Sequence, residues 1–202
     1  MKPQLETWSG EFGRAYTERN QIDWQRRLPT FRNILDGLEL HRVLEVGCNR
    51  GHNLRAFLEI LGPDTDILGI EPGRYARELA RQLHPGFGVL AGSADDLPLK
   101  EASADLVFTA GVLIHIAPAD LPRALSEIVR VSRRYILAME YFSEEPVAIH
   151  YRGLDEHLWK RDFLADYLKV EPRLRVVKSG FSGREDGFDD TTWWLLEKPA
   201  DT

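Results

Sequence analysis

The sequence predicts a single α/β domain. We expect a mostly parallel, twisted sheet covered by helices, with an antiparallel hairpin at the C-terminus and a helical cap at the N-terminus. Three observations lead to this fold class. Short apolar runs alternate with amphipathic helical segments through the first two thirds of the 202 residues. The runs are apolar on both faces, as in buried parallel strands. The tail breaks this alternation with two strand-like runs joined by a polar, acidic loop.

The N-terminal region, residues 1–38, is expected to form the cap. Trp8, Phe12 and Tyr16 recur at intervals of four residues, so they would share one helical face. Residues 24–39 also have helical spacing, with Pro29 as a candidate kink. Two interpretations of the first segment stay open: a helix packed on the core, or a lid over a bound ligand.

The core, residues 39–202, is expected to follow in βαβ order and to form one domain with the cap, without a linker between them. The expected strands and helices are RVLEV (42–46), the helix of residues 51–62 closed by Gly62, DILGIEP (66–72), the helix of residues 73–84, FGVLAG (87–92), a strand from residue 104, the helix of residues 120–132, RYILAMEYF (134–142), and the two hairpin strands 173–181 and 191–198.

Composition and charge exclude several classes. The net charge of −6 argues against a nucleic-acid binder, which usually has a basic surface. Cys48 is the single cysteine, which excludes an internal disulfide and a thiolate zinc site. The acidic run 186–190 lacks a calcium-loop pattern, so we expect a solvated turn and no metal. No stretch approaches the roughly 20 apolar residues of a membrane span. We therefore expect a cytoplasmic monomer or homodimer without a membrane partner.

The stretch VLEVGCNRGHNL (43–54) predicts a ligand at a glycine-hinged turn between a strand and a helix. Gly47 and Gly51 have the spacing G-x-x-x-G. A dinucleotide site would have glycine where Asn49 stands, and a phosphate-binding loop would end in GK[ST]. The turn therefore suits a ligand that needs close backbone approach but carries no phosphate, such as S-adenosylmethionine.

Acidic residues after the next strands support this ligand. Glu71 ends the second strand, where a carboxylate can accept hydrogen bonds from both ribose hydroxyls of an adenosine. Glu45 is placed to organise the loop or the amino-acid end of the ligand. Ser93, Ala94 and Asp95 follow the third strand and could meet the adenine edge.

EVGCNRG, GIEP, GSADDLPL and ADLVFTAGVLIHI, in this order, resemble the motifs of class I S-adenosylmethionine-dependent methyltransferases over residues 42–141. The resemblance implies a Rossmann-like fold and S-adenosylmethionine as cofactor. Many members carry Asp where this chain has Ser93, and Asp95 is then the candidate substitute. The implied cofactor-binding residues are Glu45, Gly47, Cys48, Asn49, Gly51, Asn53, Glu71, Pro72, Ser93, Ala94, Asp95, Ala110 and Gly111.

A narrower resemblance covers nearly the whole chain. ETWSGEFGRAYTERN, GVLIHIAP, EPVAIHYRG, LWKRDF and DDTTWWLLEK are similar to methylases associated with pseudaminic acid biosynthesis. This resemblance implies a small, anionic acceptor, such as a nonulosonic acid or its nucleotide-activated form.

Three residues are the first candidates for the chemistry, with His150 and His157 as rivals of His115. His115 lies just past the fourth strand, where acceptor and methyl donor meet in such folds, and could take a proton. The alternative is a histidine that hydrogen-bonds backbone. Glu140 and Tyr141 end the fifth strand and would face the acceptor, unless Glu140 is a buried, paired glutamate.

Polar groups elsewhere are candidates for holding the acceptor. Arg152 and Arg161 stand in a basic, aromatic segment and could clamp a carboxylate or phosphate. The alternative is exposed charges at a helix start, paired with Asp162 and Asp166. The remaining acceptor candidates are Tyr16, Arg19, Asn20 and Tyr151.

Two other functions stay open. One is a methyltransferase of an amino acid or a natural-product intermediate, since the same basic cluster suits any carboxylate. The other is a non-catalytic S-adenosylmethionine-binding module in a sugar-biosynthesis complex. A measurement of turnover would distinguish this binding module from an enzyme.

Overall fold

The computed structural model describes residues 3–199, and the ends of the predicted cap and core at residues 1–2 and 200–202 lie outside this range. Within it, a seven-stranded sheet has the order β3-β2-β1-β4-β5-β9-β8. The strands are β1 Arg42–Val46, β2 Asp66–Ile70, β3 Gly88–Leu90, β4 Ala104–Ala110, β5 Ser132–Glu140, β8 Arg175–Ser182 and β9 Thr191–Glu197. The first five run parallel, and β9 pairs antiparallel with both β5 and β8, which confirms the predicted sheet and hairpin.

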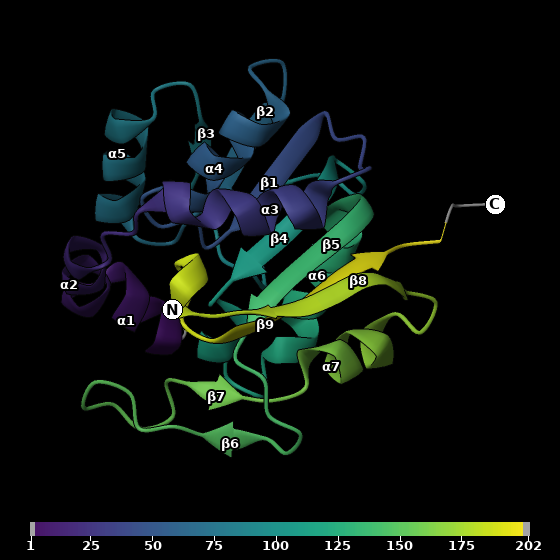
Figure 1. Ribbon diagram of the computed structural model, residues 1–202. Coiled ribbons are helices and arrows are strands. Elements are labelled where there is room, and N and C mark those ends of the chain that lie inside the picture. Colours follow the sequence, from purple (N-terminus) through teal and green to yellow (C-terminus); the bar gives the residue numbers. More distant parts are fainter. Residues whose placement is uncertain (1–2, 200–202) are drawn as a thin grey trace.

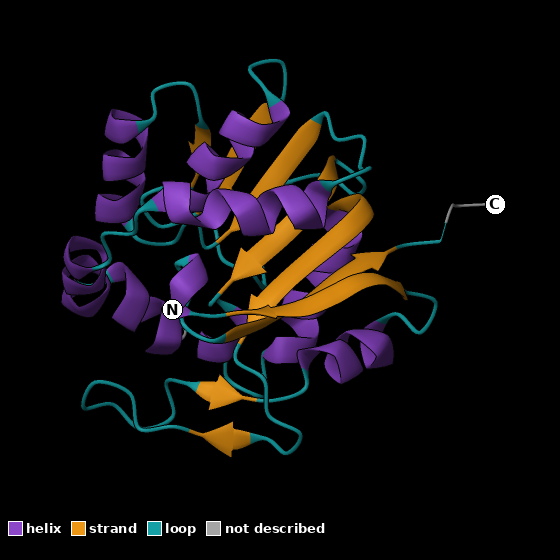
Figure 2. Ribbon diagram, in the orientation of Figure 1, coloured by secondary structure: helices purple, strands orange, loops and turns teal. Residues whose placement is uncertain are grey.

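Helices cover both faces of this sheet (Figures 1 and 2). One apolar layer buries α3 (Leu28–Leu35), α4 (His52–Leu61) and part of α5 (Arg74–Leu83) against the sheet. The other buries α6 (Leu121–Val131) and α7 (Phe163–Val170). Successive side chains of a strand point to opposite faces, so both faces of these apolar strands are buried.

The N-terminal cap consists of short helices rather than one. Helices α1 (Pro3–Ser9) and α2 (Glu11–Arg19) meet at Gly10, and η1 (Trp24–Arg27) leads into α3. A Cβ at Gly13 would stand 1.8 Å from the carbonyl oxygen of Trp8, so only glycine allows the two helices to pack this closely. Trp8 still contacts the rings of Phe12 and Tyr16, so the predicted aromatic cluster forms across the bend.

Two further details differ from expectation. Pro29 lies in the first turn of α3, where its missing N–H has no helical partner to lose, and therefore does not kink the helix. A small two-stranded sheet, β6 (Val147–Ala148) with β7 (Trp159–Lys160), stands apart from the main sheet and was not predicted. The one-turn helices η2 (Leu113–His115) and η3 (Arg184–Asp186) complete the elements.

Candidate active site

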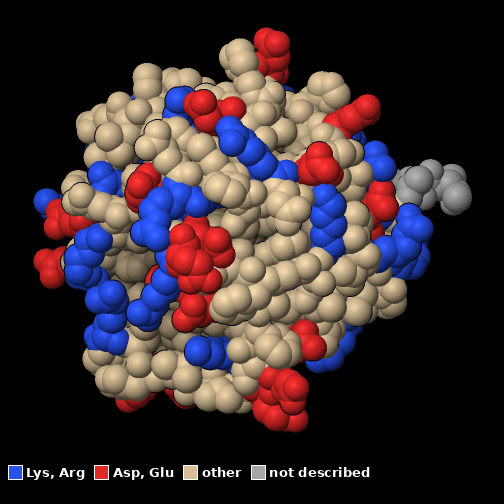
Figure 3. All heavy atoms as spheres, viewed as in Figure 1, with Lys and Arg blue, Asp and Glu red and all other residues tan. Residues whose placement is uncertain are grey.

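A cavity of about 630 Å³ lies where β1, β2 and β4 end, between the sheet and the N-terminal helices α1 and α2. This volume is in the range of small-molecule sites, and the carboxyl ends of parallel strands are where such folds bind ligands. Figure 3 shows a hollow at the left of the molecule, near α1 and α2, with Lys and Arg side chains on its rim and Asp and Glu side chains beside it.

The turn after β1 forms one wall of the cavity. Gly47, Asn49 and Gly51 have left-handed φ angles of 76°, 46° and 79°. A Cβ at Gly47 would stand 2.5 Å from a methyl group of Val112, so this position needs glycine both for its φ angle and for space. Gly51 does not line the cavity. It precedes the first residue of α4 and thus shapes the turn, which corrects its predicted contact with the ligand.

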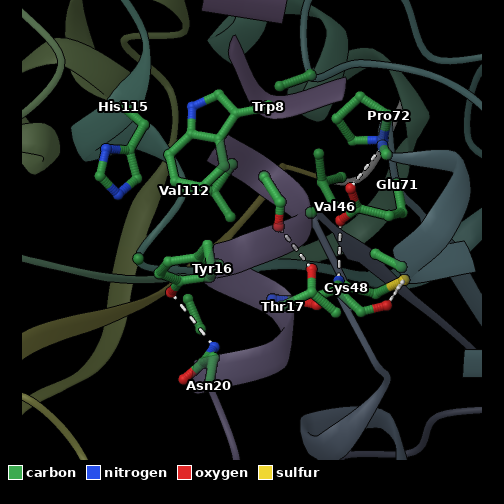
Figure 4. Close-up of a pocket in the computed structure, with 18 of the residues that line it drawn as sticks. Trp8, Tyr16, Thr17, Asn20, Val46, Cys48, Glu71, Pro72, Val112 and His115 are labelled. Atoms are coloured by element: carbon green, nitrogen blue, oxygen red, sulfur yellow. Dashed lines mark hydrogen bonds between the residues drawn. The ribbon is translucent and has the colours of Figure 1, made fainter. Parts of the chain in front are cut away.

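Glu71 joins the loops that follow β1 and β2. Its Oε2 accepts a hydrogen bond from the Asn49 amide at 2.9 Å, and its Oε1 accepts one from the Gly73 amide at 2.7 Å (Figure 4). Burial raises the pKa of Glu71, and these two amides oppose that effect. A carboxylate has about four acceptor positions, so the group retains capacity for ribose hydroxyls.

Glu45, Asn53 and Arg27 form a buried relay. Arg27 Nη1 donates to Asn53 Oδ1 at 2.6 Å, and Asn53 Nδ2 donates to Glu45 Oε1 at 2.7 Å. Glu45 Oε2 is buried without a hydrogen-bond partner among the described residues. Burial raises the pKa of Glu45 to about 8. A carboxylate oxygen left unsatisfied at a cavity wall fits the ammonium of an amino-acid ligand such as the methionine end of S-adenosylmethionine.

The remaining predicted cofactor residues also lie on this wall. Ser93 Oγ donates to Asp95 Oδ1 at 2.6 Å, so the two act together where the resemblance suggested a substitution. Burial raises the pKa of the Cys48 thiol well above its usual value, which keeps it protonated. These residues line the cavity together with the other predicted residues of the set, which comprises Cys48, Pro72, Ser93, Ala94, Asp95, Ala110 and Gly111.

His115 lies at the opposite end of the cavity, in η2. Its ring is 4.6 Å from that of Trp8 and 5.2 Å from that of Tyr151. Its Nδ1 is 2.6 Å from the His157 carbonyl oxygen, which can only accept, so Nδ1 carries the proton and Nε2 has a free lone pair. Burial lowers the pKa of His115 to about 4, so the ring is neutral at physiological pH. Figure 4 shows it beside Trp8.

Tyrosines gather at the same end. Tyr16, Tyr141 and Tyr151 all line the cavity, and Asn20 Nδ2 donates to Tyr16 Oη at 3.3 Å. Burial, together with Tyr151 and Asp189, raises the pKa of Tyr16 to about 12. Burial likewise raises the pKa of Tyr141. The hydroxyls of Tyr16 and Tyr141 are therefore protonated and can donate hydrogen bonds to an acceptor molecule. Arg19 and Arg152 line the cavity too.

Glu140 does not line the cavity, contrary to our expectation. Its carboxylate is fully buried and accepts hydrogen bonds from the backbone amides of Val112 and Ile114 at 3.3 and 3.4 Å. Burial raises its pKa to about 7, and the hydrogen bonds oppose this. Glu140 therefore supports the loop that carries His115. This agrees with the alternative interpretation of Glu140 as a buried, paired glutamate.

Arg161 is likewise placed away from the cavity. Its Nε donates to Asp166 Oδ2 at 2.6 Å, and both side chains are largely covered. Arg161 therefore follows the alternative interpretation, in which it pairs with an aspartate near a helix start. It directly precedes Asp162, which caps α7.

Sequence analysis did not assign Trp8, Arg27 or Asp189 to the site, although all three line the cavity. Trp8 was assigned only to an aromatic face, Arg27 to a helix, and Asp189 to a solvated acidic turn. For Trp8 the pairing of glycines at positions 10 and 13 was a usable signal of a tight bend. For Arg27 and Asp189 no local signal exists, because contacts between distant parts of the chain bring them to the cavity. One such contact is the hydrogen bond from Arg27 Nε to the Gly187 carbonyl oxygen at 2.9 Å, which joins residues 160 positions apart.

Comparison with known proteins agrees with this geometry. Residues 44–135 match the model of a family described as "Methyltransferase domain". This match covers a little under half of the chain, and it supports S-adenosylmethionine as the cofactor.

Individual relatives are more distant. The chain is 27% identical over 165 residues to the uncharacterized methyltransferase YcgJ of Bacillus subtilis (strain 168), covering 77% of this chain and 61% of that protein. It is 33% identical over 92 residues to the malonyl-[acyl-carrier protein] O-methyltransferase of Serratia marcescens, covering 46% and 34%. The chain thus spans less than two thirds of the length of these curated relatives.

A solved structure shares the fold. The 1,6-didemethyltoxoflavin-N1-methyltransferase of Burkholderia thailandensis, with bound 1,6-didemethyltoxoflavin and S-adenosylhomocysteine, superposes with a TM-score of 0.71 at 16% identity. The match covers 98% of this chain and 87% of that one. At this identity the likeness establishes the Rossmann-like methyltransferase fold.

None of the helices in residues 3–199 combines the length and apolar character needed to cross a membrane. The same residues contain no group of three or more His, Cys, Asp or Glu that could hold a metal ion.

Proposed function

We propose that this protein transfers the methyl group of S-adenosylmethionine to a small, anionic metabolite. The observation that carries the proposal is the cavity of about 630 Å³, which runs from Glu45 and Glu71 to His115 and the tyrosines. A volume of this size leaves room beside the cofactor for a small molecule only. The acceptor end is also polar and aromatic, as a site that orients a hydroxylated acid requires.

Positioning supplies most of the proposed catalysis. The bound cofactor provides an activated methyl group, and the protein must hold the attacking atom in line with it, an effect worth up to about 7–11 kcal/mol in well-oriented reactions. Glu71 and the Gly47–Asn49 turn hold the donor end. His115 Nε2, neutral and unprotonated, accepts a hydrogen bond from the acceptor's nucleophilic group. With so low a pKa, His115 takes the proton only as the methyl bond forms.

The first acceptor class to test is a nonulosonic acid or its nucleotide-activated form. The motif resemblance supports this class, and so do the hydroxyl donors Tyr16, Tyr141 and Tyr151. Amino acids and natural-product intermediates are the alternative acceptors. A non-catalytic binding module is disfavoured because His115 and the tyrosines form a second, polar end that cofactor binding alone does not need.

The N-terminal helices are proposed as a lid, so that residues 1–38 complete the site on the core of residues 39–202. The carbonyl oxygen of Trp8 lies close enough to Gly73 that a Cβ there would be 3.3 Å away, and Arg14 lies over the Tyr75 ring at 4.9 Å. These contacts tie α1 to the loop after β2 and α2 to helix α5. A covered site excludes water from the transfer. A cytoplasmic location and a monomer or homodimer stay predictions from the sequence.

Calorimetric titration tests the proposal. S-adenosylmethionine and S-adenosylhomocysteine should bind in the micromolar range, whereas NADH should not. The loaded protein is then incubated with nonulosonic acids, their nucleotide-activated forms and amino acids, and S-adenosylhomocysteine formation is measured. Binding without turnover on any acid would favour the binding module. If neither adenosyl ligand binds, the proposed methyltransferase activity is wrong.

A further inference from the structure

The two edges of the main sheet differ in length. At one edge β3 (Gly88–Leu90) has three residues, whereas at the other β8 (Arg175–Ser182) has eight. A strand at the edge of a sheet presents unpaired backbone N–H and C=O groups to whatever lies beside it. A very short edge strand limits this exposure, so β3 offers little to a further strand. β8 offers a long edge and is the last strand of the sheet (Figures 1 and 2).

Apolar side chains are exposed along β8. Val176, Val177 and Phe181 are 46%, 42% and 62% exposed, and Phe181 is the most exposed large apolar residue within residues 3–199. Phe142 is also exposed, and its ring lies 6.1 Å from that of Trp194 on the neighbouring strand β9. Figure 3 shows a largely uncharged area where β8 lies in Figure 1. Exposed apolar residues gathered in this way mark an interaction surface.

The devices that usually protect an edge strand are weak in β8. Charged side chains, proline and bulges discourage pairing with another strand. β8 contains no proline, and its lysine, Lys178, reaches to α3, where Nζ donates to the carbonyl oxygens of Asn33 and Asp36 at 3.0 and 2.8 Å. A bulge interrupts the pairing with β9 just after Val176, but residues 178–182 pair with β9 in regular register. This stretch is therefore open to another strand.

A second copy of this chain fits the edge. A two-fold axis perpendicular to the sheet makes two β8 strands run antiparallel, and both copies then use the same surface. One residue of β8 must face its own copy at this axis. Gly180 lies in the middle of residues 178–182 and brings no side chain to the axis. Each Phe181 then faces Ser179 of the partner subunit, and Lys178 does not meet its own copy.

The charges at the two ends of β8 favour this orientation. Arg173 and Arg175 stand at its start, whereas Glu185 and Asp186 follow its end and exceed the charge of Arg184 between them and the strand. Antiparallel pairing places the basic start of one strand beside the acidic end of the other. Parallel pairing would place like charges together. Such charges determine the orientation and specificity of an interface more than its affinity.

We propose that β8 is the dimerisation edge of this protein: two copies pair antiparallel through it and join their sheets into one continuous sheet. The outward backbone groups of both strands then gain hydrogen-bond partners, and Phe181 of each copy is covered by the other. This inference goes beyond the proposed methyl transfer and does not depend on it.

Sedimentation velocity of the full chain over a range of concentrations tests the proposal. The wild-type protein should form a dimer as its concentration rises. Phe181→Lys places a charge on the edge and should raise the dissociation constant of the dimer by roughly a hundredfold, because a two-fold interface contains the change twice. Leu83→Lys is the matched control, because Leu83 is 45% exposed at the end of α5, which packs against β3 at the opposite edge. It should leave the dissociation constant unchanged.

Hydrogen exchange of the wild-type protein locates the interface, and it also serves if Phe181→Lys fails to fold. Amides within residues 176–182 should exchange more slowly at concentrations where the dimer forms than in the monomer. The amides of β3 are the internal control and should exchange at the same rate under both conditions.

Three outcomes would overturn the inference: a wild-type protein that stays monomeric, a dimer that Phe181→Lys does not weaken more than Leu83→Lys, or a dimer without added protection of residues 176–182. A persistent monomer would leave this edge to a strand of another protein. Phe181 does not line the cavity, so Phe181→Lys should bind S-adenosylhomocysteine as the wild-type protein does. Failure of the dimer is thereby distinguishable from failure of the proposed function.

Discussion

The two ends of the cavity are built in different ways. At the cofactor end, the groups stand in short stretches directly after β1, β2, β3 and β4, and backbone amides fix them, as Glu71 shows with Asn49 and Gly73. At the acceptor end, the groups come from α2, η2, the segment after β5 and the loop before β9. A cofactor common to many proteins can be met by one local pattern. An individual acceptor requires a combination assembled by the whole chain.

The largest expected effect comes from a substitution that impairs the acceptor end alone. His115→Ala should lower the rate constant for methyl transfer by about 10²–10⁴-fold, the usual contribution of a positioned proton acceptor. The affinity for S-adenosylhomocysteine should stay within a few fold. His150→Ala is the control, because His150 is exposed and bonds Asp155 outside the cavity. A full rate in His115→Ala would assign the histidine to structure only.

Next comes the cofactor end. Glu71→Ala should weaken binding of S-adenosylhomocysteine by roughly a hundredfold, because it removes the charged acceptor of the ribose hydroxyls, and a hydrogen bond to a charged group contributes about 1.5–3 kcal/mol. Calorimetry measures the loss. Glu59→Ala, whose carboxylate pairs only with Arg55 on the surface of α4, should bind normally. Unchanged affinity in Glu71→Ala would show that the loop after β2 does not contact the cofactor.

The pH dependence of cofactor binding sharpens the comparison. The pKa of Glu45 in the free protein is raised to about 8, so the carboxyl is largely protonated at neutral pH. A bound ammonium favours its ionised form. Binding therefore releases a proton, and the affinity for S-adenosylhomocysteine should rise between about pH 6 and pH 8, by up to about tenfold per unit.

Calorimetry in buffers of different ionisation enthalpy measures the released proton. Glu71 also has a raised pKa, so the variant Glu45→Gln identifies the group responsible. That variant should show a flat affinity over the same range. A wild-type affinity that is flat, or that falls as pH rises, would contradict the ammonium contact of Glu45.

The smallest effect probes one hydroxyl at the acceptor end. Tyr16→Phe should raise the acceptor's KM about fivefold, since one hydrogen bond contributes about 1 kcal/mol. Cofactor affinity should not change, because the bond from Asn20 to Tyr16 lies away from Glu71 (Figure 4). Tyr75→Phe removes a hydroxyl group from α5 at the cofactor end and serves as the comparison variant. Equal losses for both ligands in Tyr16→Phe would mean that the hydroxyl holds α2 in place.

The same difference decides what could be predicted from sequence. The parallel sheet, the hairpin and the place of most predicted cofactor residues on the cavity wall followed from local motifs, because a residue after a parallel strand necessarily reaches the carboxyl edge. Glu140 and Tyr141 are adjacent, yet only Tyr141 lines the cavity, since neighbouring side chains of an extended strand point in opposite directions. Arg27 and Asp189 could not be found, because docking of η1 on the β8–β9 connection brings them into the cavity.

Trp8 gives the protein an internal optical probe. Five tryptophans occur in the chain, and Trp8 is the one that lines the cavity, with its ring against the neutral imidazole of His115. Its fluorescence should therefore respond to ligands while Trp24, Trp159, Trp193 and Trp194 provide a constant background. Stopped-flow recordings of this emission can time the arrival of cofactor and acceptor separately, without any label on either molecule.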